Sequence, residues 1–249
     1  MKKILTTLTC VGLLASSASA DFARLEMGLG AWAQNSSGKI NYTDNGADGT
    51  YASDKGSITQ PYLWALVKHP VPAIPNLRLE YVSLEDEGKG SGKFKDFDIG
   101  GVTTDVKYNM KQYDIIPYYN ILDNTAWITL DLGLDLKIVQ ATIDASDKAP
   151  FTGYSGSSNF LLPLLYVRGR VEIPATDIGL EADAKYISYN SNAVYDVRAK
   201  IDYTFDVFPV VQPALEIGYR VQKVDVEDSS SLNVDLEFSG VYAGIMLRY

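Results

Sequence analysis

The chain has 249 residues, enough for one large β-domain or two small ones, and a net charge of −9 at neutral pH. This acidity argues against nucleic acid as a partner, because a chain that binds phosphates needs a surplus of Lys and Arg. Seventeen tyrosines outnumber the eight phenylalanines and three tryptophans together, which favours strands and interfacial aromatic side chains over a helical protein.

Residues 1–20 have the pattern of a secretory signal peptide. Lys2 and Lys3 form a positive end, an apolar stretch follows, and Ala-Ser-Ala at 18–20 supplies an A-x-A cleavage site. The apolar stretch is too short to span a bilayer. We therefore predict that this segment is cleaved, and that the mature chain, 21–249, is a single domain and more acidic by two charges.

The only cysteine, Cys10, lies inside the predicted signal peptide. A lipoprotein signal would make it the lipidated residue, but Thr9 is larger than the residue such signals prefer at that position. We predict removal of Cys10 with the signal, which leaves the mature chain without a thiol, a disulfide or a thiolate metal site.

The first strand is predicted at 23–33, where apolar residues alternate with Arg, Glu and Gly. The next stretch, 34–57, is polar and has no apolar periodicity, so we predict a long loop there. Eight more strands are predicted at 62–68, 77–84, 103–121, 128–138, 160–173, 178–189, 195–205 and 213–224, and a last strand ends at Tyr249.

Part of the loop after the first strand has the composition of a calcium loop. Asp44, Asp48 and Gly49 have suitable spacing, but Gly46 and Lys55 stand where a calcium loop needs an Asp or Asn and a bidentate Glu. We interpret the segment as a turn.

Two strands carry the most specific patterns. Six apolar residues alternate with Thr, Asp, Gly and Lys over 128–138, and this period of two is long enough to cross a bilayer on one face. The strand at 103–121 shows a slip in the alternation near Gln112 and Pro117, which we interpret as a β-bulge.

The connections between strands differ between the two ends of the predicted sheet. They are short at 69–76, 122–125, 174–177 and 206–211, long at 34–57, 85–102 and 144–158, and of moderate length at 190–193 and 225–232. Short periplasmic turns and long outer loops are typical of bacterial barrels. The predicted fold class is all-β: a single antiparallel up-and-down transmembrane β-barrel of about ten strands, although eight or twelve would also fit if 94–121 were divided differently.

Charged residues alternate with the apolar ones on the predicted strands, and they must face the lumen because Arg or Lys facing lipid would cost about 2 to 4 kcal/mol at the midplane. This lumen charge ladder comprises Asp131, Asp135, Lys137, Arg168, Arg170, Glu172, Glu181, Asp183, Lys185, Asp196, Arg198, Lys200 and Asp202. We interpret it as cross-strand ion pairs that fill a narrow lumen. The alternative is a charged path for ions or a small solute.

Few residues could support an enzyme. His69 is the only histidine, and it lies in a proline-rich turn on the predicted periplasmic side. Glu85 and Glu87 lie in a loop rich in Gly and Lys, without the closed cleft that an aspartic-type site needs. We assign no catalytic, cofactor-binding or metal-binding residue.

The last stretch, Val241–Tyr249, alternates strictly and ends the chain on an aromatic residue. Its residues Tyr242, Gly244, Leu247 and Tyr249 resemble the C-terminal assembly signal of bacterial outer-membrane β-barrels. The resemblance implies location in the bacterial outer membrane and contact with outer-membrane lipid, lipopolysaccharide and the barrel assembly machinery.

A second, smaller resemblance concerns Asp98-Ile-Gly-Gly101, whose Gly pair is similar to that of a family of small outer-membrane proteins named for a Gly-Gly doublet. Two functions stay open at this point. One is a non-enzymatic barrel with an envelope or surface-interaction role and acidic outer loops, and the other is a narrow, porin-like channel for small solutes.

Overall fold

The computed structural model describes residues 23–44, 47–54, 56–71, 73–94, 98–190, 192–227 and 232–249. The predicted signal peptide, Cys10, Gly46 and Lys55 lie outside the described residues. Within the residues that the structure describes, no helix has the length and apolar character needed to cross a membrane.

The described residues form eleven strands, joined by turns, in one sheet. The strands are β1 (Arg24–Asp44), β2 (Ala47–Ser53), β3 (Ser57–Lys68), β4 (Asn76–Lys93), β5 (Asp98–Thr125), β6 (Ile128–Ala145), β7 (Tyr154–Glu172), β8 (Ile178–Tyr189), β9 (Asn192–Thr204), β10 (Gln212–Glu227) and β11 (Leu232–Arg248).

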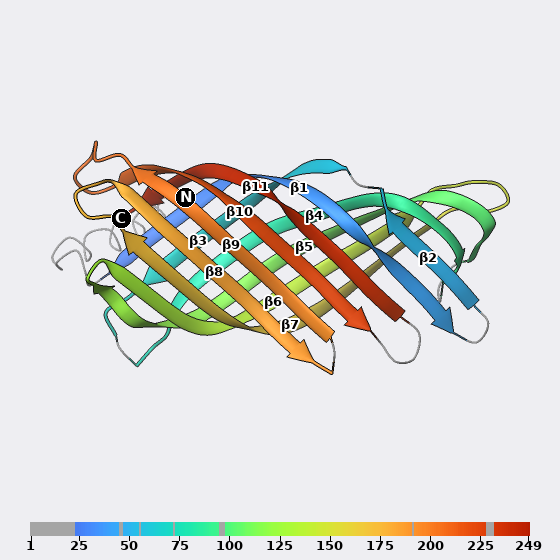
Figure 1. Ribbon diagram of the computed structural model, residues 1–249, viewed down its shortest axis with the longest axis horizontal. Helices are drawn as coiled ribbons and strands as arrows, with labels where there is room; N and C mark the ends of the chain where they lie inside the picture. The colour runs from blue at the N-terminus through green and yellow to red at the C-terminus, as the bar shows by residue number, and fades with distance from the viewer. Residues whose placement is uncertain are drawn as a thin grey trace, which may run out of the picture.

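The sheet closes on itself because β11 pairs with β1. This antiparallel pairing runs from Glu26↔Arg248 to Tyr42↔Leu232 and removes both edges of the sheet. Figure 1 shows the tilted strands around a single wall, with the C-terminus at the left and β2 at the opposite end. The fold is therefore a closed antiparallel β-barrel, as predicted.

Strands β2 and β3 share one position in the wall. β1 pairs with β3 along 24–35 and with β2 along 39–44. β4 likewise pairs with β3 along 77–82 and with β2 along 88–92. The barrel thus has ten positions around its wall, with the second one divided in two, and the prediction of about ten strands is confirmed.

The prediction of long loops at 34–57 and 85–102 is wrong for most of their length, whereas the loop predicted at 144–158 is present but limited to 146–153. β1 continues to Asp44, β4 continues to Lys93, β5 already begins at Asp98, and β7 already begins at Tyr154. These segments keep the period of two with polar residues outside, while their inward residues are apolar or small, such as Ile40 on β1 and Gly88 and Gly90 on β4. A search for outward-facing apolar residues cannot find such strands.

The predicted bulge near Gln112 and Pro117 is also wrong. β4 and β5 pair without a shift from Asn76↔Tyr118 to Gly90↔Thr104. The alternation of apolar and polar residues is irregular in the sequence because two inward-facing, buried residues, Ile116 and Tyr118, are themselves largely apolar. The register shifts of β5 with its neighbours lie near its two ends instead.

An apolar band surrounds the outside of the barrel near the end that carries both termini. Large apolar side chains in this band are exposed on successive strands, among them Leu29, Leu63, Leu79, Ile115, Leu134, Leu165, Leu180, Ile201, Ile217 and Ile245. An exterior of this kind is matched to hydrocarbon rather than water. We call the part of the barrel inside this band the membrane section.

Beyond the band the same wall continues away from the termini, and we call this part the extension. It comprises 35–44 of β1, all of β2, 85–93 of β4, 98–111 of β5, 139–145 of β6, 154–160 of β7, 222–227 of β10 and 232–239 of β11. On β6, for example, Gln140 and Thr142 are exposed outside while Val139 is buried inside. The polarity of the two faces therefore reverses along single strands.

Candidate functional site: the charged lumen

The structure brings the predicted ladder together inside the membrane section. Twelve of its thirteen residues are buried: Asp131, Asp135, Lys137, Arg168, Arg170, Glu181, Asp183, Lys185, Asp196, Arg198, Lys200 and Asp202. Glu172, the remaining one, lies at the lumen's mouth near the termini and is partly exposed. All of them alternate with the outward apolar residues, because successive side chains of a strand point to opposite faces.

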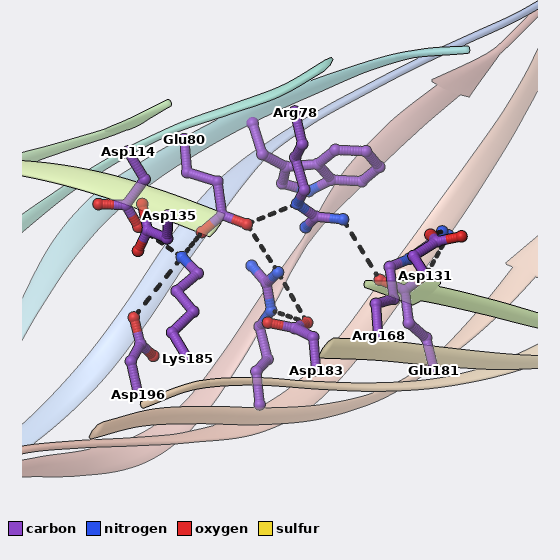
Figure 2. Close-up of polar contacts among 12 residues, drawn as sticks. Arg78, Glu80, Asp114, Asp131, Asp135, Arg168, Glu181, Asp183, Lys185 and Asp196 are labelled. Atoms are coloured by element: carbon purple, nitrogen blue, oxygen red, sulfur yellow. Dashed lines mark hydrogen bonds and ion pairs between the residues drawn. The ribbon is translucent and has the colours of Figure 1, made fainter. Parts of the chain in front are cut away.

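Two lysines link the walls at the far end of this network. Lys137 Nζ lies 2.8 Å from Asp114 Oδ1 and 3.5 Å from Asp196 Oδ2. Lys185 Nζ donates to Glu80 Oε2 at 2.7 Å and also contacts Asp114. Figure 2 shows Lys185 extended between Glu80 and Asp114. Because the carboxylates come from β4, β5 and β9, the two amines cross the lumen rather than merely pairing neighbouring strands.

Two arginines of β7 form a second cluster closer to the termini. Arg168 donates to Asp131 at 2.6 Å and to Glu181 at 2.8 Å. Arg170 donates two hydrogen bonds to Asp202, at 2.6 and 3.0 Å. The planar guanidinium suits such forked contacts, so each arginine holds carboxylates of more than one strand.

The two clusters are joined through Glu80. Its Oε1 accepts hydrogen bonds from Arg78 at 2.6 Å and from Arg198 at 2.9 Å. Arg198 also donates to Asp183 at 2.9 Å. Arg78 Nη1 lies 3.6 Å from Glu181, which belongs to the second cluster. The ladder is therefore one connected network and not a set of separate pairs.

Several members of this network were absent from the predicted ladder. They are Glu26, Arg78, Glu80, Asp114, Glu216 and Arg220, all buried. Arg78 and Glu80 alternate with leucines on a predicted strand, so the same rule would have found them. Asp114 was hidden by the incorrect bulge, which assigned no facing to that part of β5.

Aromatic side chains complete the filling of the lumen. Trp64 Nε1 and Tyr62 Oη both donate to Glu216, at 3.1 and 2.7 Å. Lys200 Nζ lies 4.5 Å from the centre of the Trp64 ring, a cation–π contact. A Cβ at Gly28 would come within 2.4 Å of Trp64 Nε1, so this glycine provides the space for the indole.

Asp135 differs from the other carboxylates. It is fully buried, but among the described residues neither of its oxygens accepts a hydrogen bond. Its nearest ion pair is with Lys137, at 4.0 Å. Asp135 thus lies inside the network without a hydrogen-bonded partner of its own among the described residues.

The lumen opens into a hollow at the end that carries the termini. A polar cavity of about 460 Å³ lies there, with Arg24, Lys68, Asp123, Glu172 and Arg248 in its wall. Lys68 and Asp123 form an ion pair at 2.5 Å across part of it. Beyond this hollow, toward the extension, lie the buried side chains of the network.

The interior of the extension is mostly apolar and holds one buried carboxylate with neutral partners. Asp86 accepts hydrogen bonds from Ser36 at 2.6 Å, Tyr51 at 2.7 Å and Ser53 at 2.7 Å. Burial, and next to it the contact with Asp86, raises the pKa of Tyr51, so the phenol remains a donor. Tyr51 belongs to a cluster of buried apolar residues that also includes Leu84 and Val106.

His69 takes part in the turn between β3 and β4. Its Nδ1 accepts the Val71 N–H at 3.1 Å, and its Nε2 lies 3.1 Å from the Pro75 carbonyl oxygen. Such an arrangement fits a neutral imidazole with the proton on Nε2. The interactions are those of a turn residue.

The four residues of the predicted assembly signal lie on two faces of β11 and of Tyr249, which follows it. Tyr242 is buried and faces the lumen with Gly244, whereas Leu247 and Tyr249 face outward and are exposed. Tyr249 and Leu25 exchange backbone hydrogen bonds of 2.8 and 3.0 Å, so the last residue closes the barrel. Recognition of these residues during assembly stays a prediction.

The predicted Gly-Gly doublet lies at the start of β5. Gly100 has a φ of 71°, a conformation that favours glycine, and its N–H donates to Asp98 at 2.8 Å. This backbone conformation accounts for a glycine at position 100 but not at position 101. Membership of the corresponding family stays a prediction.

No family model and no curated protein matches the chain. Solved structures with a similar arrangement include the translocator domain of the autotransporter NalP from Neisseria meningitidis, with 12% identity, 100% of this chain and 95% of that chain covered, and a TM-score of 0.41. The transport unit of the autotransporter AIDA-I from Escherichia coli has 10% identity, coverage of 93% and 91%, and a TM-score of 0.41. The outer membrane protein OprG from Pseudomonas aeruginosa has 11% identity, coverage of 91% and 95%, and a TM-score of 0.31. At these values the assignment of the fold rests on the strand pairing of the chain itself.

Proposed function

We propose that the chain is a non-enzymatic protein of the bacterial outer membrane whose barrel is largely closed and whose extension serves an envelope or surface-interaction role. The observation that carries this proposal is the connected network of buried charges, which fills the membrane section from wall to wall. A barrel built for free passage of solutes would need an open lumen, and open aqueous channels occur at about sixteen strands.

The direction of the barrel in the membrane follows from its two ends. At the end with the termini the strands stop close to the apolar band, whereas at the other end they continue beyond it into the extension. Long outer segments are typical of bacterial barrels, so we place the termini on the periplasmic side. The extension then stands outside the cell. Its outward face mixes charges, with Lys107 between Glu85 and Glu87, and is suited to water and to protein partners rather than to hydrocarbon.

Assembly and contacts complete the proposal. Export through the predicted signal peptide 1–20, insertion by the barrel assembly machinery, and contact with outer-membrane lipid and lipopolysaccharide agree with the apolar band and with β11 as the closing strand. We include no nucleic acid, because the chain is acidic.

A localisation experiment tests the first half of the proposal. The full chain should appear in outer-membrane fractions and migrate faster on gels before heating than after it. Replacing both Leu247 and Tyr249 with Asp should leave the chain degraded or in the periplasm, since the charged side chains would face hydrocarbon beside the closing strand. Normal outer-membrane folding of that variant would contradict the role of the C-terminal residues.

Conductance tests the second half. We expect purified protein in planar bilayers to give only small or rare current steps. Replacing Arg168 and Arg170 with Ala should increase the leak, because carboxylates would lose their partners and the space of two long side chains would open. Large, long-lived openings of the unmodified protein would contradict a closed lumen.

The second candidate, a narrow channel for small solutes, is favoured by one observation. The polar cavity of about 460 Å³ leads from the periplasmic end up to the network, as the entrance of a channel would. The two candidates differ in the current of the unmodified protein, so the same recordings distinguish them.

A further inference from the structure

The wall of the barrel is interrupted between β7 and β8. Their pairing runs from Glu172↔Gly179 to Leu165↔Tyr186 and ends there. β7, however, extends as far as Tyr154, and its residues 155–164 pair only with β6 among the described residues. We call the side of this segment that faces away from β6 the free edge.

The free edge is open on both faces of the strand. Every residue from Ser157 to Leu161 is exposed, although alternate side chains point toward the inside of the barrel. Phe160 lies opposite the buried Val139 and therefore faces inward, but 42% of its surface is accessible. On the other margin, Tyr189 at the end of β8 is 74% exposed. Beyond the end of their pairing, β7 and β8 therefore leave each other's facing sides accessible.

The sequence does not protect this edge as natural edges usually are protected. Residues 154–164 contain no Lys, Arg, Asp or Glu, and their upper part consists mainly of Ser, Gly and Asn, whose small side chains leave the backbone accessible. Charges, bulges and short length are the usual ways to prevent pairing with another chain. Only Pro163, which has no N–H, limits pairing at the lower end.

Part of the free edge lies at the level of the apolar band. Leu161 is paired with Ile138, the last outward apolar residue of β6, and Asn159 is paired with Gln140, the first polar one. The edge therefore begins inside the apolar band, at Leu164 opposite Asp135, and continues past the membrane boundary. Unpaired backbone groups near hydrocarbon are unfavourable because no water is there to bond them, which favours an occupant that satisfies them.

A second copy of this chain cannot fill the edge by the usual two-fold pairing. Two barrels in one membrane have the same orientation, so their β7 strands run the same way along the membrane normal, whereas antiparallel pairing needs opposite directions. Parallel pairing also fails, because strands tilted by about 35 to 45° cross one another when rotated about the normal. The occupant must be a chain that is not held in this orientation.

We propose that the free edge binds an extended, uncharged segment of a partner protein by strand addition, at the outer boundary of the membrane. This inference rests on the proposed surface-interaction role and specifies its kind of partner. Backbone hydrogen bonds would supply much of the affinity, as in other strand-addition complexes. The edge has no charge, and the ring of Phe160 is accessible on its inner face. The partner's segment should therefore alternate small polar residues with apolar residues that cover this ring.

A peptide-binding experiment tests the proposal on the full mature barrel in detergent micelles, with folding verified by its heat-dependent gel mobility. The probe is a fluorescent, end-blocked peptide of about eight alternating Thr and Val residues, measured by anisotropy. The same peptide with alternate backbone nitrogens methylated is the control probe, since it lacks those donors. We expect saturable binding of the first peptide. The methylated peptide should bind at least about tenfold more weakly.

Matched lysine variants identify the edge. Ser157→Lys with Asn159→Lys places charges on the outward face of the free edge, whereas Thr142→Lys with Gln140→Lys places them on the directly paired residues of β6, which has neighbours on both sides. The first pair should weaken peptide binding about tenfold or more, and the second should leave it nearly unchanged. Hydrogen exchange should show protection of β7 amides on binding.

Three results would overturn the proposal: no saturable binding by the folded barrel, equal weakening by both lysine pairs, or dimers that the Ser157 and Asn159 variants abolish. The last would assign the edge to a second copy. Failure here would leave the proposed function standing, because localisation and conductance are measured separately.

Discussion

The membrane section and the extension share the same strands but have opposite polarity. On β6, Asp131 and Asp135 face inward and Leu132 faces outward within the membrane section. A few residues later Val139 faces inward and Gln140 outward. One continuous strand thus passes from a surface matched to lipid to a surface matched to water, and only the alternation is retained.

The difference shows that the solvent outside a barrel determines what its interior must contain. In hydrocarbon, apolar side chains gain nothing by facing inward, so the lumen can hold charges as long as they are paired with one another, which offsets the cost of burying them. In water the hydrophobic effect again drives apolar groups inward, and the extension has an apolar interior with few charges. Its one buried carboxylate with hydroxyl partners, Asp86, is consistent with this rule.

The largest contrast should come from removing one charge in each region. Arg168→Ala leaves Asp131 without its cation and removes one of the four cations around Glu181, so we expect a loss of about 3 to 5 kcal/mol in the free energy of unfolding from lipid. Lys107→Ala removes exposed ion pairs of the extension and should cost less than about 1 kcal/mol. Urea titrations of both variants in the same vesicles measure the difference.

A double-mutant cycle sharpens this result. If Arg168 acts mainly through its bond to Asp131, the variant with Ala at both positions should be more stable than the sum of the two single losses predicts. Additive losses would mean that the two side chains do not act as a pair. Similar losses for Arg168→Ala and Lys107→Ala would remove the contrast between the regions.

The second contrast concerns the outward face of β6. Leu132→Arg places a cation in the apolar band and should destabilise the barrel by about 2 to 4 kcal/mol. Thr142→Arg places the same cation on the same face in the extension, where water solvates it, and should change stability by less than about 0.5 kcal/mol. Gel shift after refolding into lipid at increasing urea measures both.

If Leu132→Arg and Thr142→Arg destabilised the barrel equally, the boundary of the membrane section would lie elsewhere than between Ile138 and Gln140. An intermediate position tests where that boundary lies. Gln140 is the first outward polar residue above Ile138, and Gln140→Arg should therefore behave like Thr142→Arg rather than like Leu132→Arg.

The sequence alone was sufficient where the membrane imposes a simple rule. Outward leucines and inward charges on β6 follow from period two and the cost of charge in lipid, so the fold and twelve buried ladder residues were predictable. The extension was not, because the apolar face changes from outside to inside at Val139, and a rule that follows outward apolar residues stops there. The partners of Glu80 were also unpredictable, since Arg198 belongs to a strand distant in the chain and the register alone does not reveal contacts across a lumen.

The smallest expected effect concerns the buried carboxylate of the extension. Asp86→Asn keeps the size of the side chain but replaces charge-assisted hydrogen bonds by neutral ones, and we expect a loss of about 1 to 2 kcal/mol. The amide oxygen can still accept from two hydroxyls, and the remaining hydroxyl can turn to accept from the amide nitrogen. Ser53→Ala, which removes one of the three donors, is the matched control and should cost no more than Asp86→Asn. The loss should appear as faster hydrogen exchange in β2 and the outer part of β4, with unchanged gel mobility of the folded barrel, because the lumen network below is untouched. A loss of folded barrel in lipid as large as that of Arg168→Ala would instead mean that the extension and the membrane section unfold as one unit.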